Sequence, residues 1–525
     1  MIFDAIVVGT GPAGAWACHA LRGKNVLALD VGYRSAGIPE LQGNLHTLRQ
    51  TCEDLFEPLI GRGFESLANV FLKPVSLKLK SPGMSYVIRD WERLAPIRTG
   101  NFSGVVSFAQ GGLANAWGAG VYRFNSRDLA GFPVSAEALA PFYDELTEHI
   151  GVCGSNDDLA EDFGAESQLL PPIRLGRLAA DILARYQRKK EWFRSRGIAM
   201  GHSRLAVLTG EHRGRAPYRY ENLEFFRPYD AAVYNPVFTL DALVASGQVK
   251  LETGRLVTGY EERPSHVEVI ARNLAAGTEE RFSARNLLLA AGTLSTTRIV
   301  LAASRDFATR RPLLDNPMSG IPLFALRQIG QARDGAETSL AQLNLVYAAP
   351  GMSGPLQASF YGTSGPLSSD VLFQLPLSVS GNLAFSKYVS PATAMCLVFY
   401  PGSAGAANYI RLSPGGDLEV NCEFGGRGPA ERSLIQAFRS IGYLGSPAMC
   451  QYPPMGSSLH YAGTLPMRAD PGPYETDPYG RLYGSQRVYV CDGACFSALP
   501  AKNLTFTIMA NAIRIAARIG STLDQ

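Results

Sequence analysis

The chain has 525 residues, of which 46% are hydrophobic and 18% are charged, and its formal net charge is +3. Globular chains average about 25% charged residues, so this chain is apolar enough to bury a large core, and a disordered protein is excluded. With 49 Lys and Arg against 46 Asp and Glu, it also lacks the basic excess of a nucleic-acid-binding protein.

The chain opens with the pattern of a βαβ unit. Residues 3–8 and 25–31 are short apolar strands, and residues 12–22 form a helix of small side chains between them. This order predicts a parallel sheet. Since the first strand begins almost at the N-terminus, we expect no signal peptide.

The middle and the end of the chain contain further elements of both kinds. Helices are expected at 135–150, 175–196, 429–441 and 503–520, and strands at 250–256, 266–271, 286–292 and 487–491. Residues 320–425 alternate apolar and polar side chains between many turns, which is typical of an antiparallel sheet. We therefore predict one interleaved nucleotide-binding domain with a second, antiparallel domain inserted into it.

Cysteine spacing and hydropathy bear on the compartment. The eight cysteines include no metal-ligand spacing, which favours buried free thiols and a reducing compartment. No uncharged apolar stretch is long enough for a membrane span. We expect a cytoplasmic protein without a membrane span. A basic run at 185–196 could face an anion, but a solvated helix face is the favoured interpretation.

The first of two glycine clusters is Gly9-Thr-Gly11-Pro12-Ala13-Gly14, which joins the first strand to the first helix. In such a unit the glycines allow a tight turn, close approach of a pyrophosphate and close helix packing. Asp30 ends the next strand, about 20 residues on, where a carboxylate accepts from a ribose hydroxyl. The pattern disfavours NADP but leaves FAD and NAD both open.

The second cluster runs from Gly111 to Gly120 and contains Asn115 and Trp117. A flexible surface loop is one interpretation. A backbone with few side chains beside a large aromatic ring favours the other, close approach to a flat cofactor.

Two polar residues near the end of the chain are candidates for catalysis. His460 is the only histidine after residue 266, and Asn503 precedes the last helix. A lone histidine is more often structural than catalytic, and Asn503 could simply cap the helix. A helix N-terminus aimed at a flavin would also stabilise negative charge on the reduced ring.

Together these motifs resemble the glucose–methanol–choline (GMC) flavoprotein oxidoreductases, in order from the first residues to the last. Gly9–Gly14 is similar to the FAD fingerprint of that family, and Gly111–Gly118 to its G-G-x-x-x-x-W-G segment. Residues 132–143 resemble a linker of the bacterial sugar- and alcohol-oxidising branch. His460-x-x-Gly463-Thr464-x-x-Met467 resembles the segment that carries the catalytic base, and the last strand and helix match as well.

The resemblance implies a set of site residues. His460 and Asn503 would be catalytic. FAD would be bound by Gly9, Gly11, Pro12, Ala13, Gly14, Asp30, Gly111, Gly112, Asn115, Trp117, Val257, Ala291, Asp492, Gly493 and Thr505. No metal is implied.

Four positions depart from the family pattern. Asp30 stands where Glu is usual, Leu504 replaces a proline and Arg468 replaces a glycine. Members with covalently bound flavin carry a histidine where this chain has Ala116, so the resemblance implies FAD held without a covalent bond.

The resemblance also implies a fold and a reaction. The fold would be α/β, a Rossmann-like FAD-binding domain (1–145, 235–318 and 452–525) with an interleaved α+β substrate-binding domain (146–234 and 319–451) on an antiparallel sheet. The enzyme would oxidise a small-molecule alcohol, sugar-like or a natural-product intermediate, by hydride transfer to the flavin, with O₂ or another electron acceptor completing the cycle. A GMC-type lyase or decarboxylase and a non-catalytic flavin-binding module remain alternatives.

Overall fold

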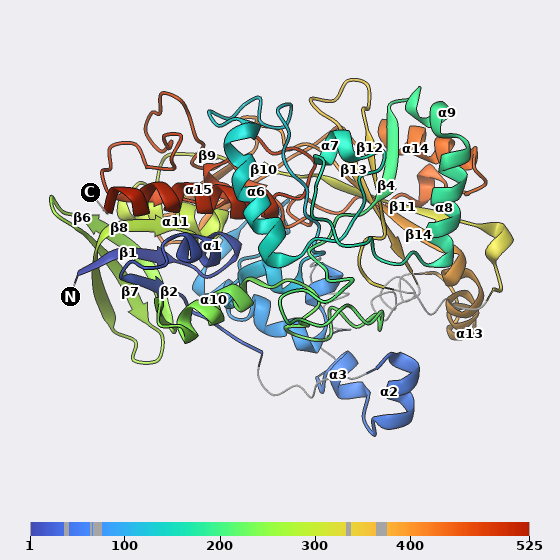
Figure 1. Ribbon diagram of the computed structural model, residues 1–525, viewed down its shortest axis with the longest axis horizontal. Coiled ribbons are helices and arrows are strands. Elements are labelled where there is room, and N and C mark those ends of the chain that lie inside the picture. Colours follow the sequence, from blue (N-terminus) through green and yellow to red (C-terminus); the bar gives the residue numbers. More distant parts are fainter. Residues whose placement is uncertain are drawn as a thin grey trace.

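The computed structural model describes residues 2–35, 41, 43–63, 66, 76–331, 338–363 and 375–523. Its elements gather around two large sheets at opposite ends of the molecule (Figure 1).

The first sheet has seven strands taken from the beginning, the middle and the end of the chain. Its order is β5-β2-β1-β8-β7-β6, and β18 pairs with the end of β8. β1, β2, β5, β8 and β18 are parallel, whereas β6, β7 and β8 pair in antiparallel fashion. The bounds are β1 Ile2–Val8, β2 Val26–Leu29, β5 Val249–Glu252, β6 Arg255–Glu262, β7 Val267–Asn273, β8 Glu279–Leu289 and β18 Val488–Val490.

Helices made largely of small and apolar residues cover this sheet. α1 (Pro12–Ala20) packs against the C-terminal helix α15 (Thr505–Leu523) and against α10 (Pro236–Ala245). α6 (Ala136–Ile150) also contacts α15, and α11 (Thr293–Ala303) lies against β6. Because α1 is short and rich in alanine and glycine, it approaches β1 closely enough to place its N-terminus beside the ends of the strands.

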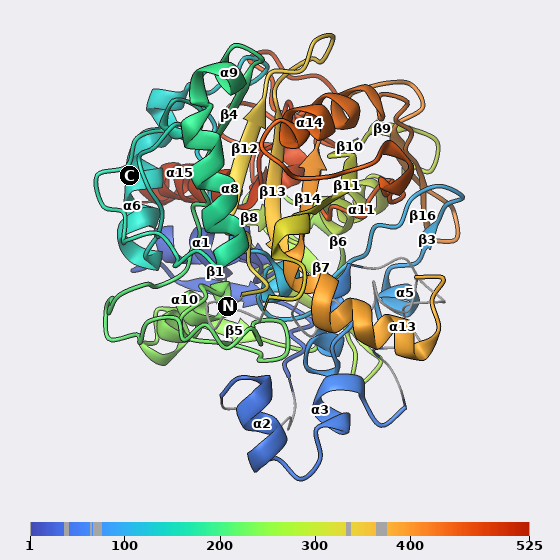
Figure 2. The same cartoon turned by 90° about the vertical axis from the view of Figure 1, so that its right-hand side faces the viewer.

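The second sheet is antiparallel throughout, with the order β11-β14-β13-β12-β4. Its strands are β4 Ile198–His202, β11 Met318–Phe324, β12 Leu343–Tyr347, β13 Leu356–Gly362 and β14 Thr393–Phe399. α8 (Arg177–Arg188) and α14 (Pro429–Arg439) pack over one face and bury a separate apolar core (Figure 2).

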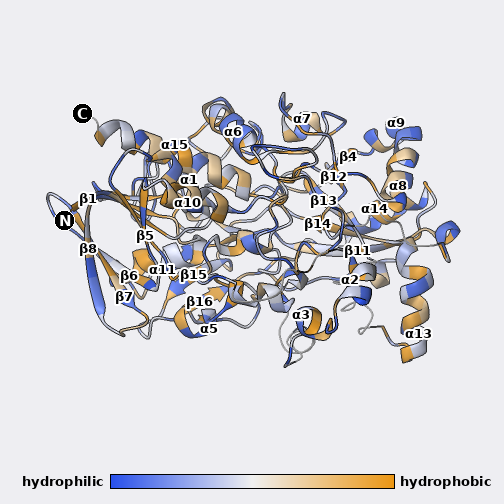
Figure 3. Cartoon of the chain, turned by 60° about the horizontal axis from the view of Figure 1, so that its bottom comes forward, coloured by the Kyte–Doolittle hydropathy of each residue, from blue (hydrophilic) through white to orange (hydrophobic). Residues whose placement is uncertain are grey.

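Two small sheets join the regions. β10 (Leu314–Asp315) pairs with β17 (Tyr461–Ala462). The four-stranded sheet β3-β16-β15-β9 comprises β3 Ile97–Arg98, β16 Leu418–Asn421, β15 Tyr409–Leu412 and β9 Arg311–Pro312. The remaining helices are short: α2 Leu45–Thr51, α3 Phe56–Ile60, α5 Trp91–Leu94, α7 Ala160–Phe163, α9 Lys190–Arg194 and α13 Val379–Ala384. α13 projects from one edge and exposes Val379 and Leu383 (Figure 3).

The α/β prediction with a second, antiparallel sheet is confirmed, although the first sheet is mixed rather than wholly parallel, and three expected elements also differ. The strand expected at 250–256 is two strands, because Gly254, at a φ of 72°, turns the chain between β5 and β6. The helix expected at 175–196 breaks at Lys189 into α8 and α9. Within 320–425, β15 and β16 leave the antiparallel sheet and form the four-stranded one.

Part of the basic run at 185–196 forms local ion pairs. Arg185 pairs with Asp181, and Lys190 pairs with Asp158. Among the residues that the structure describes, no helix is long and apolar enough to cross a membrane.

Candidate active site

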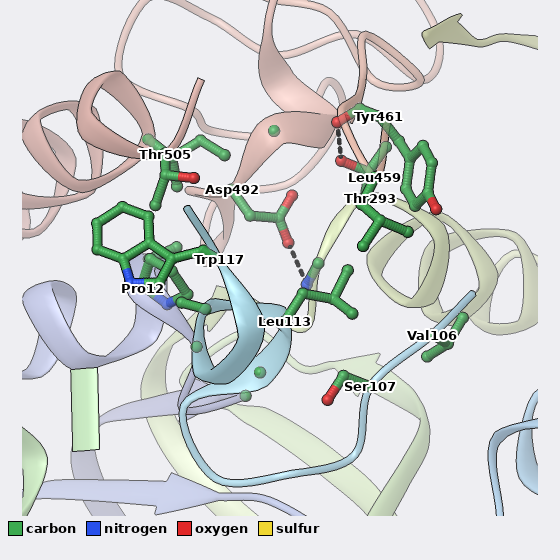
Figure 4. A pocket seen from close by; sticks show the side chains of 18 of the residues that line it. Pro12, Val106, Ser107, Leu113, Trp117, Thr293, Leu459, Tyr461, Asp492 and Thr505 are labelled. Carbon is green, nitrogen blue, oxygen red and sulfur yellow. Dashed lines mark hydrogen bonds between the residues drawn. The ribbon is translucent and has the colours of Figure 1, made fainter. Parts of the chain in front are cut away.

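One large cavity lies between the two main sheets. Together with its open mouth it holds about 1910 Å³ of space free of atoms. One wall is formed by the carboxyl ends of β1, β2 and β8, where open α/β sheets bind their ligands. The opposite wall includes Ser359 and Tyr361 of β13 and Phe399 of β14. In Figure 4, Pro12, Trp117 and Thr505 lie on one side of the cavity and Val106 and Ser107 on the other.

The turn between β1 and α1 has the shape that its glycines predict. Gly9 has a φ of 94°, and a Cβ there would lie 2.6 Å from the carbonyl oxygen of Ala290. A Cβ on Gly14 would lie 1.9 Å from the carbonyl oxygen of Gly9. Both positions therefore require glycine for packing. Gly11 differs, because the nearest heavy atom to its Cβ position is the Cα of Gly112, 3.9 Å away.

Gly11 and Gly112 thus bring the two glycine clusters into contact, side by side on one wall of the cavity. Both line it, with Gly9, Pro12 and Ala13. The resulting wall is bare backbone, which offers N–H groups without side chains in front of them. This wall suits a phosphate-bearing cofactor at a helix N-terminus.

Asp30 is fixed at the end of β2. Its Oδ2 accepts hydrogen bonds from the Thr10 amide (2.7 Å) and the Thr10 hydroxyl (2.5 Å), and its Oδ1 accepts from the Gly32 amide (2.9 Å). Burial raises the pKa of Asp30 to about 6. The carboxylate lines the same cavity as Gly11.

The second glycine cluster is held in shape by Asn115. Its Oδ1 accepts from Tyr86 Oη (2.9 Å) and Asn235 Nδ2 (2.8 Å), and its Nδ2 donates to the carbonyls of Gln110 (2.8 Å) and Gly112 (2.7 Å). All four hydrogen-bonding positions are occupied by protein. Asn115 lies beside the cavity rather than on it, as do the predicted residues Gly14 and Gly111.

Trp117 does line the cavity, and its Nε1 donates to the carbonyl of Tyr234 at 3.0 Å. The other predicted residues on the cavity wall are Val257, Ala291, Asp492, Gly493 and Thr505.

Asp492 ties the last strand to the end of β8. Its Oδ2 accepts from the Gly292 amide (2.9 Å; Figure 4) and from Thr296 Oγ1 (2.5 Å), and its Oδ1 accepts from the Ala494 amide (2.9 Å). Burial raises its pKa to about 6. A Cβ on Gly493 would lie 2.8 Å from Thr293 Oγ1, so the chain passes this point as bare backbone.

His460 directly precedes β17 and is held through its Nδ1. This atom lies 3.1 Å from Oδ1 of Asn316, the residue that follows β10. The Asn316 Nδ2 donates to the carbonyls of Tyr400 (2.8 Å) and Pro500 (3.0 Å). Because the reverse orientation of the amide would set an oxygen against two carbonyl oxygens, Oδ1 must accept, and Nδ1 of His460 carries the proton.

The other ring nitrogen, Nε2, is therefore an unprotonated acceptor. It lies 3.4 Å from Nδ2 of Asn503, and both residues line the cavity. Burial, with a smaller effect from the Lys78 charge, lowers the pKa of His460 to about 4. The ring of Phe399 stacks on the imidazole at 5.5 Å between centroids. At neutral pH the imidazole of His460 is thus uncharged and held in one orientation.

Two further residues of this site were not predicted from the sequence. Asn316 lies in a segment whose match to any motif was weak, and no local signal marks it. Lys78, which lines the cavity near His460, lies in the stretch between residues 50 and 100 where no pattern was found. Leu504 precedes α15, and its carbonyl accepts the first helical hydrogen bond from Ile508 (2.9 Å), so Asn503 stands one residue outside the helix cap.

The residues present fit a dinucleotide cofactor. The bare glycine walls and Asp30 line the same continuous cavity as His460 and Asn503. The buried hydroxyl of Ser295 on its wall has no hydrogen-bond partner among the residues that the structure describes. All eight cysteines are free, and the described residues contain no group of three or more His, Cys, Asp or Glu able to hold a metal ion.

Comparison of sequences relates this chain to oxidoreductases. Residues 448–512, which include His460, Asp492 and Asn503, match the sequence model of the GMC oxidoreductase family. Paromamine 6'-oxidase of Streptomyces fradiae is 23% identical over 573 residues, covering 99% of this chain and 92% of that protein.

Two solved structures share the fold. Pyridoxine 4-oxidase from Mesorbium loti matches with a TM-score of 0.59 and 16% identity over 98% of this chain and 99% of its own. A formate oxidase of Aspergillus oryzae RIB40, a variant studied for FAD modification, matches with a TM-score of 0.61 and 13% identity over 99% and 98%.

Proposed function

We propose a function for this chain as a member of the GMC oxidoreductase family. It is an oxidoreductase acting on CH–OH donors, and it oxidises a primary or secondary hydroxyl of a sugar-like or natural-product substrate. His460 is the general base. The observation that supports this most directly is the state of the imidazole. Asn316 places the proton on Nδ1, and Nε2 is left as an acceptor beside Asn503 within the cavity.

In the mechanism that we propose, Nε2 of His460 accepts the proton of the substrate hydroxyl. Nδ2 of Asn503 donates to the same oxygen in place of its long 3.4 Å contact with the imidazole, and so orients the carbon that is oxidised. Asn316 stabilises the imidazolium by accepting from Nδ1 throughout. FAD, when bound, supplies the acceptor for the hydride.

We propose that FAD is held without a covalent bond. The glycine walls at Gly9, Gly11 and Gly112 would admit the pyrophosphate, and Asp30 would accept from a ribose hydroxyl. Val257 and Ala291 would lie against the adenine, and Trp117, Gly493 and Thr505 against the ring system. Ala116 leaves no nucleophile where covalent members of the family carry a histidine. Gly14, Gly111 and Asn115 would act by shaping the turns.

The domain division that we propose follows the sheets. Residues 1–145, 235–318 and 452–525 contain every strand of the seven-stranded sheet and would form the FAD-binding domain. Residues 146–234 and 319–451 contain nearly all of the five-stranded sheet and would bind the substrate. The four-stranded sheet takes strands from both and joins them.

The test is anaerobic reduction of the bound flavin by a panel of alcohols, followed by admission of air. An alcohol oxidoreductase loses its yellow colour on addition of a substrate, and recovery in air identifies O₂ as the acceptor; recovery only with an added dye identifies another one. His460→Ala should keep its flavin and be reduced at least about 100-fold more slowly. His266→Ala, at a partly exposed histidine outside the cavity, is the matched control.

Normal reduction in His460→Ala would refute the assignment of the base. Conversion of a substrate while the flavin stays yellow would instead identify a lyase or decarboxylase.

A further inference from the structure

Lys78 carries its ammonium group into the cavity at the end that holds His460. It belongs to a single 3-10 turn, Leu77–Leu79, and lines the cavity. A Cβ on Gly118 would lie 2.7 Å from its Nζ. The Nζ also lies 4.9 Å from the ring centroid of Phe225 and 5.7 Å from that of Tyr361. The cation is therefore set between bare backbone and two aromatic rings.

The ammonium group of Lys78 has no hydrogen-bond acceptor and no ion-pair partner among the described residues. Burial lowers the pKa of Lys78 to about 8, and the charge of Glu224 opposes this change. The carboxylate of Glu224 is already used: Oε1 accepts from Thr338 Oγ1 (2.7 Å) and Oε2 from the Ser339 amide (3.4 Å). A lysine has three N–H donors, and cation–π contacts satisfy only part of their demand.

The reacting end of the cavity has no other cation in the part of the chain that the structure describes. Of the remaining charged residues on the wall, Asp30 and Asp492 are held by hydrogen bonds at the ends of β2 and β18. Arg298 donates to the carbonyls of Leu94 and Pro96, and Arg255 pairs with Glu280. Around His460 the wall is uncharged apart from Lys78, and the Lys78 charge acts on the imidazole.

We propose that Lys78 is a substrate-binding residue and that the substrate is an alcohol carrying an anionic group, a carboxylate or a phosphate. This inference rests on the proposed function. An anion would supply the acceptors that the ammonium lacks, in a desolvated site where charge-assisted hydrogen bonds are strong. It would hold the hydroxyl against His460, and an ammonium-bearing alcohol would be repelled.

Four related sugars that differ in charge distinguish an anionic substrate from a neutral or a cationic one. They are glucose, glucuronate, glucose 6-phosphate and glucosamine, which are neutral, carboxylate-bearing, phosphate-bearing and ammonium-bearing. Their dissociation constants from the oxidised holoenzyme can be measured by the change in flavin absorbance, without turnover. We expect at least one anionic sugar to bind more tightly than glucose and glucosamine to bind most weakly; the better of the two anions identifies the group.

Variants of Lys78 give the decisive comparison. Lys78→Gln should weaken binding of the preferred anion by about 10- to 100-fold, the range for loss of a charged hydrogen bond, and change glucose binding by less than about twofold. Lys78→Arg should retain most of the preference. Lys387→Gln removes a lysine outside the cavity lining and should change neither constant.

Equal affinity for charged and neutral sugars in the wild type, equal absence of binding included, would overturn the proposal. So would an equal effect of Lys78→Gln on both, or a shift of the flavin reduction potential with the binding ratio unchanged, since Lys78 would then act on the cofactor. The same binding titrations on His460→Ala measure anion binding in a variant that lacks the proposed base, and so test the role of Lys78 separately from the proposed reaction. Anion binding through Lys78 without flavin reduction by any alcohol in the wild type would contradict the oxidoreductase alone.

Discussion

Asn316 fixes the protonation of His460. The Oδ1 of Asn316 lies 3.1 Å from Nδ1 of His460, while both donors of its amide are taken by the carbonyls of Tyr400 and Pro500. Asn316 follows β10 and His460 precedes β17, and the two residues meet because Asp315 pairs with Tyr461 in the two-stranded sheet β10–β17. A residue far from His460 in the chain therefore determines which nitrogen of its imidazole is free.

Replacing Asn316 should change the pH dependence of the reaction as well as its rate. In Asn316→Asp the added carboxylate would favour the charged imidazole, so the pKa of His460 rises and the acidic limb of the pH profile moves to higher pH. In Asn316→Leu the tautomer is no longer fixed, and flavin reduction should slow by about tenfold or more. Stopped-flow reduction between pH 4 and pH 9 measures both. Identical profiles in Asn316→Asp and the wild type would contradict the positioning role.

The pH dependence of flavin reduction in the wild type follows from the pKa of His460, which is lowered to about 4. A base accepts a proton only when it is unprotonated, so the rate should be independent of pH from about pH 5 upward as far as His460 is concerned. Below the pKa the rate should fall about tenfold for each pH unit. Lys78 contributes to the lowered pKa. Lys78→Gln should therefore move the acidic limb upward, whereas Lys387→Gln should leave it in place.

Alanine substitutions at two glycines of the first turn should have different effects, one on folding and the other on cofactor binding. A Cβ on Gly14 meets the Gly9 carbonyl oxygen at 1.9 Å, so Gly14→Ala should lower the free energy of unfolding by about 3 kcal/mol or more. A Cβ on Gly11 meets only the Cα of Gly112, at 3.9 Å. Gly11→Ala should therefore fold with nearly unchanged thermal stability of the apoprotein and lose FAD. Flavin content and thermal melting of the two apoproteins test this, and equal melting temperatures would contradict it.

A buried ion pair supports the segment that carries Asn503. Lys502 Nζ contacts Asp128 Oδ2, and their side chains are 6% and 3% exposed. Asp128→Ala leaves the lysine charge buried without its partner and should lower the free energy of unfolding by about 3–5 kcal/mol. The double variant Asp128→Leu with Lys502→Met should recover much of that loss. Glu57→Gln, which breaks an exposed pair with Arg62, should change stability by less than about 1 kcal/mol. Chemical denaturation measures all three.

The parts of the site that depend on neighbouring residues could be predicted from the sequence. The Gly9–Gly14 turn depends on neighbouring residues and on backbone conformations that only glycine tolerates, so its pattern predicts its shape. His460 and Asn503 belong to short segments whose order could be compared with a family. Both lie on the same cavity, 3.4 Å apart.

Asn316 and Lys78 could not be found in this way. Asn316 is near His460 only because β10 pairs with β17, a contact between segments about 140 residues apart. Lys78 faces the cavity because a short turn lies against Gly118 and Tyr361, which come from other parts of the fold. Asn115 is the opposite case, because its motif predicts a cofactor-binding residue but its side chain does not line the cavity. Its four hydrogen bonds hold it within the loop.

The long separation along the chain between β1 and α1 and their partners β18 and α15 has a consequence for biosynthesis. β18 adds to β8, and α15 packs on α1, so segments that are made late complete a region begun by segments that are made early. A nascent chain that stops before Val488 already contains Gly9, Asp30 and His460 but lacks Asp492 and Asn503. The wall of the cavity is therefore complete only after α15 has been made, and a translation product that stops before Val488 would lack part of it.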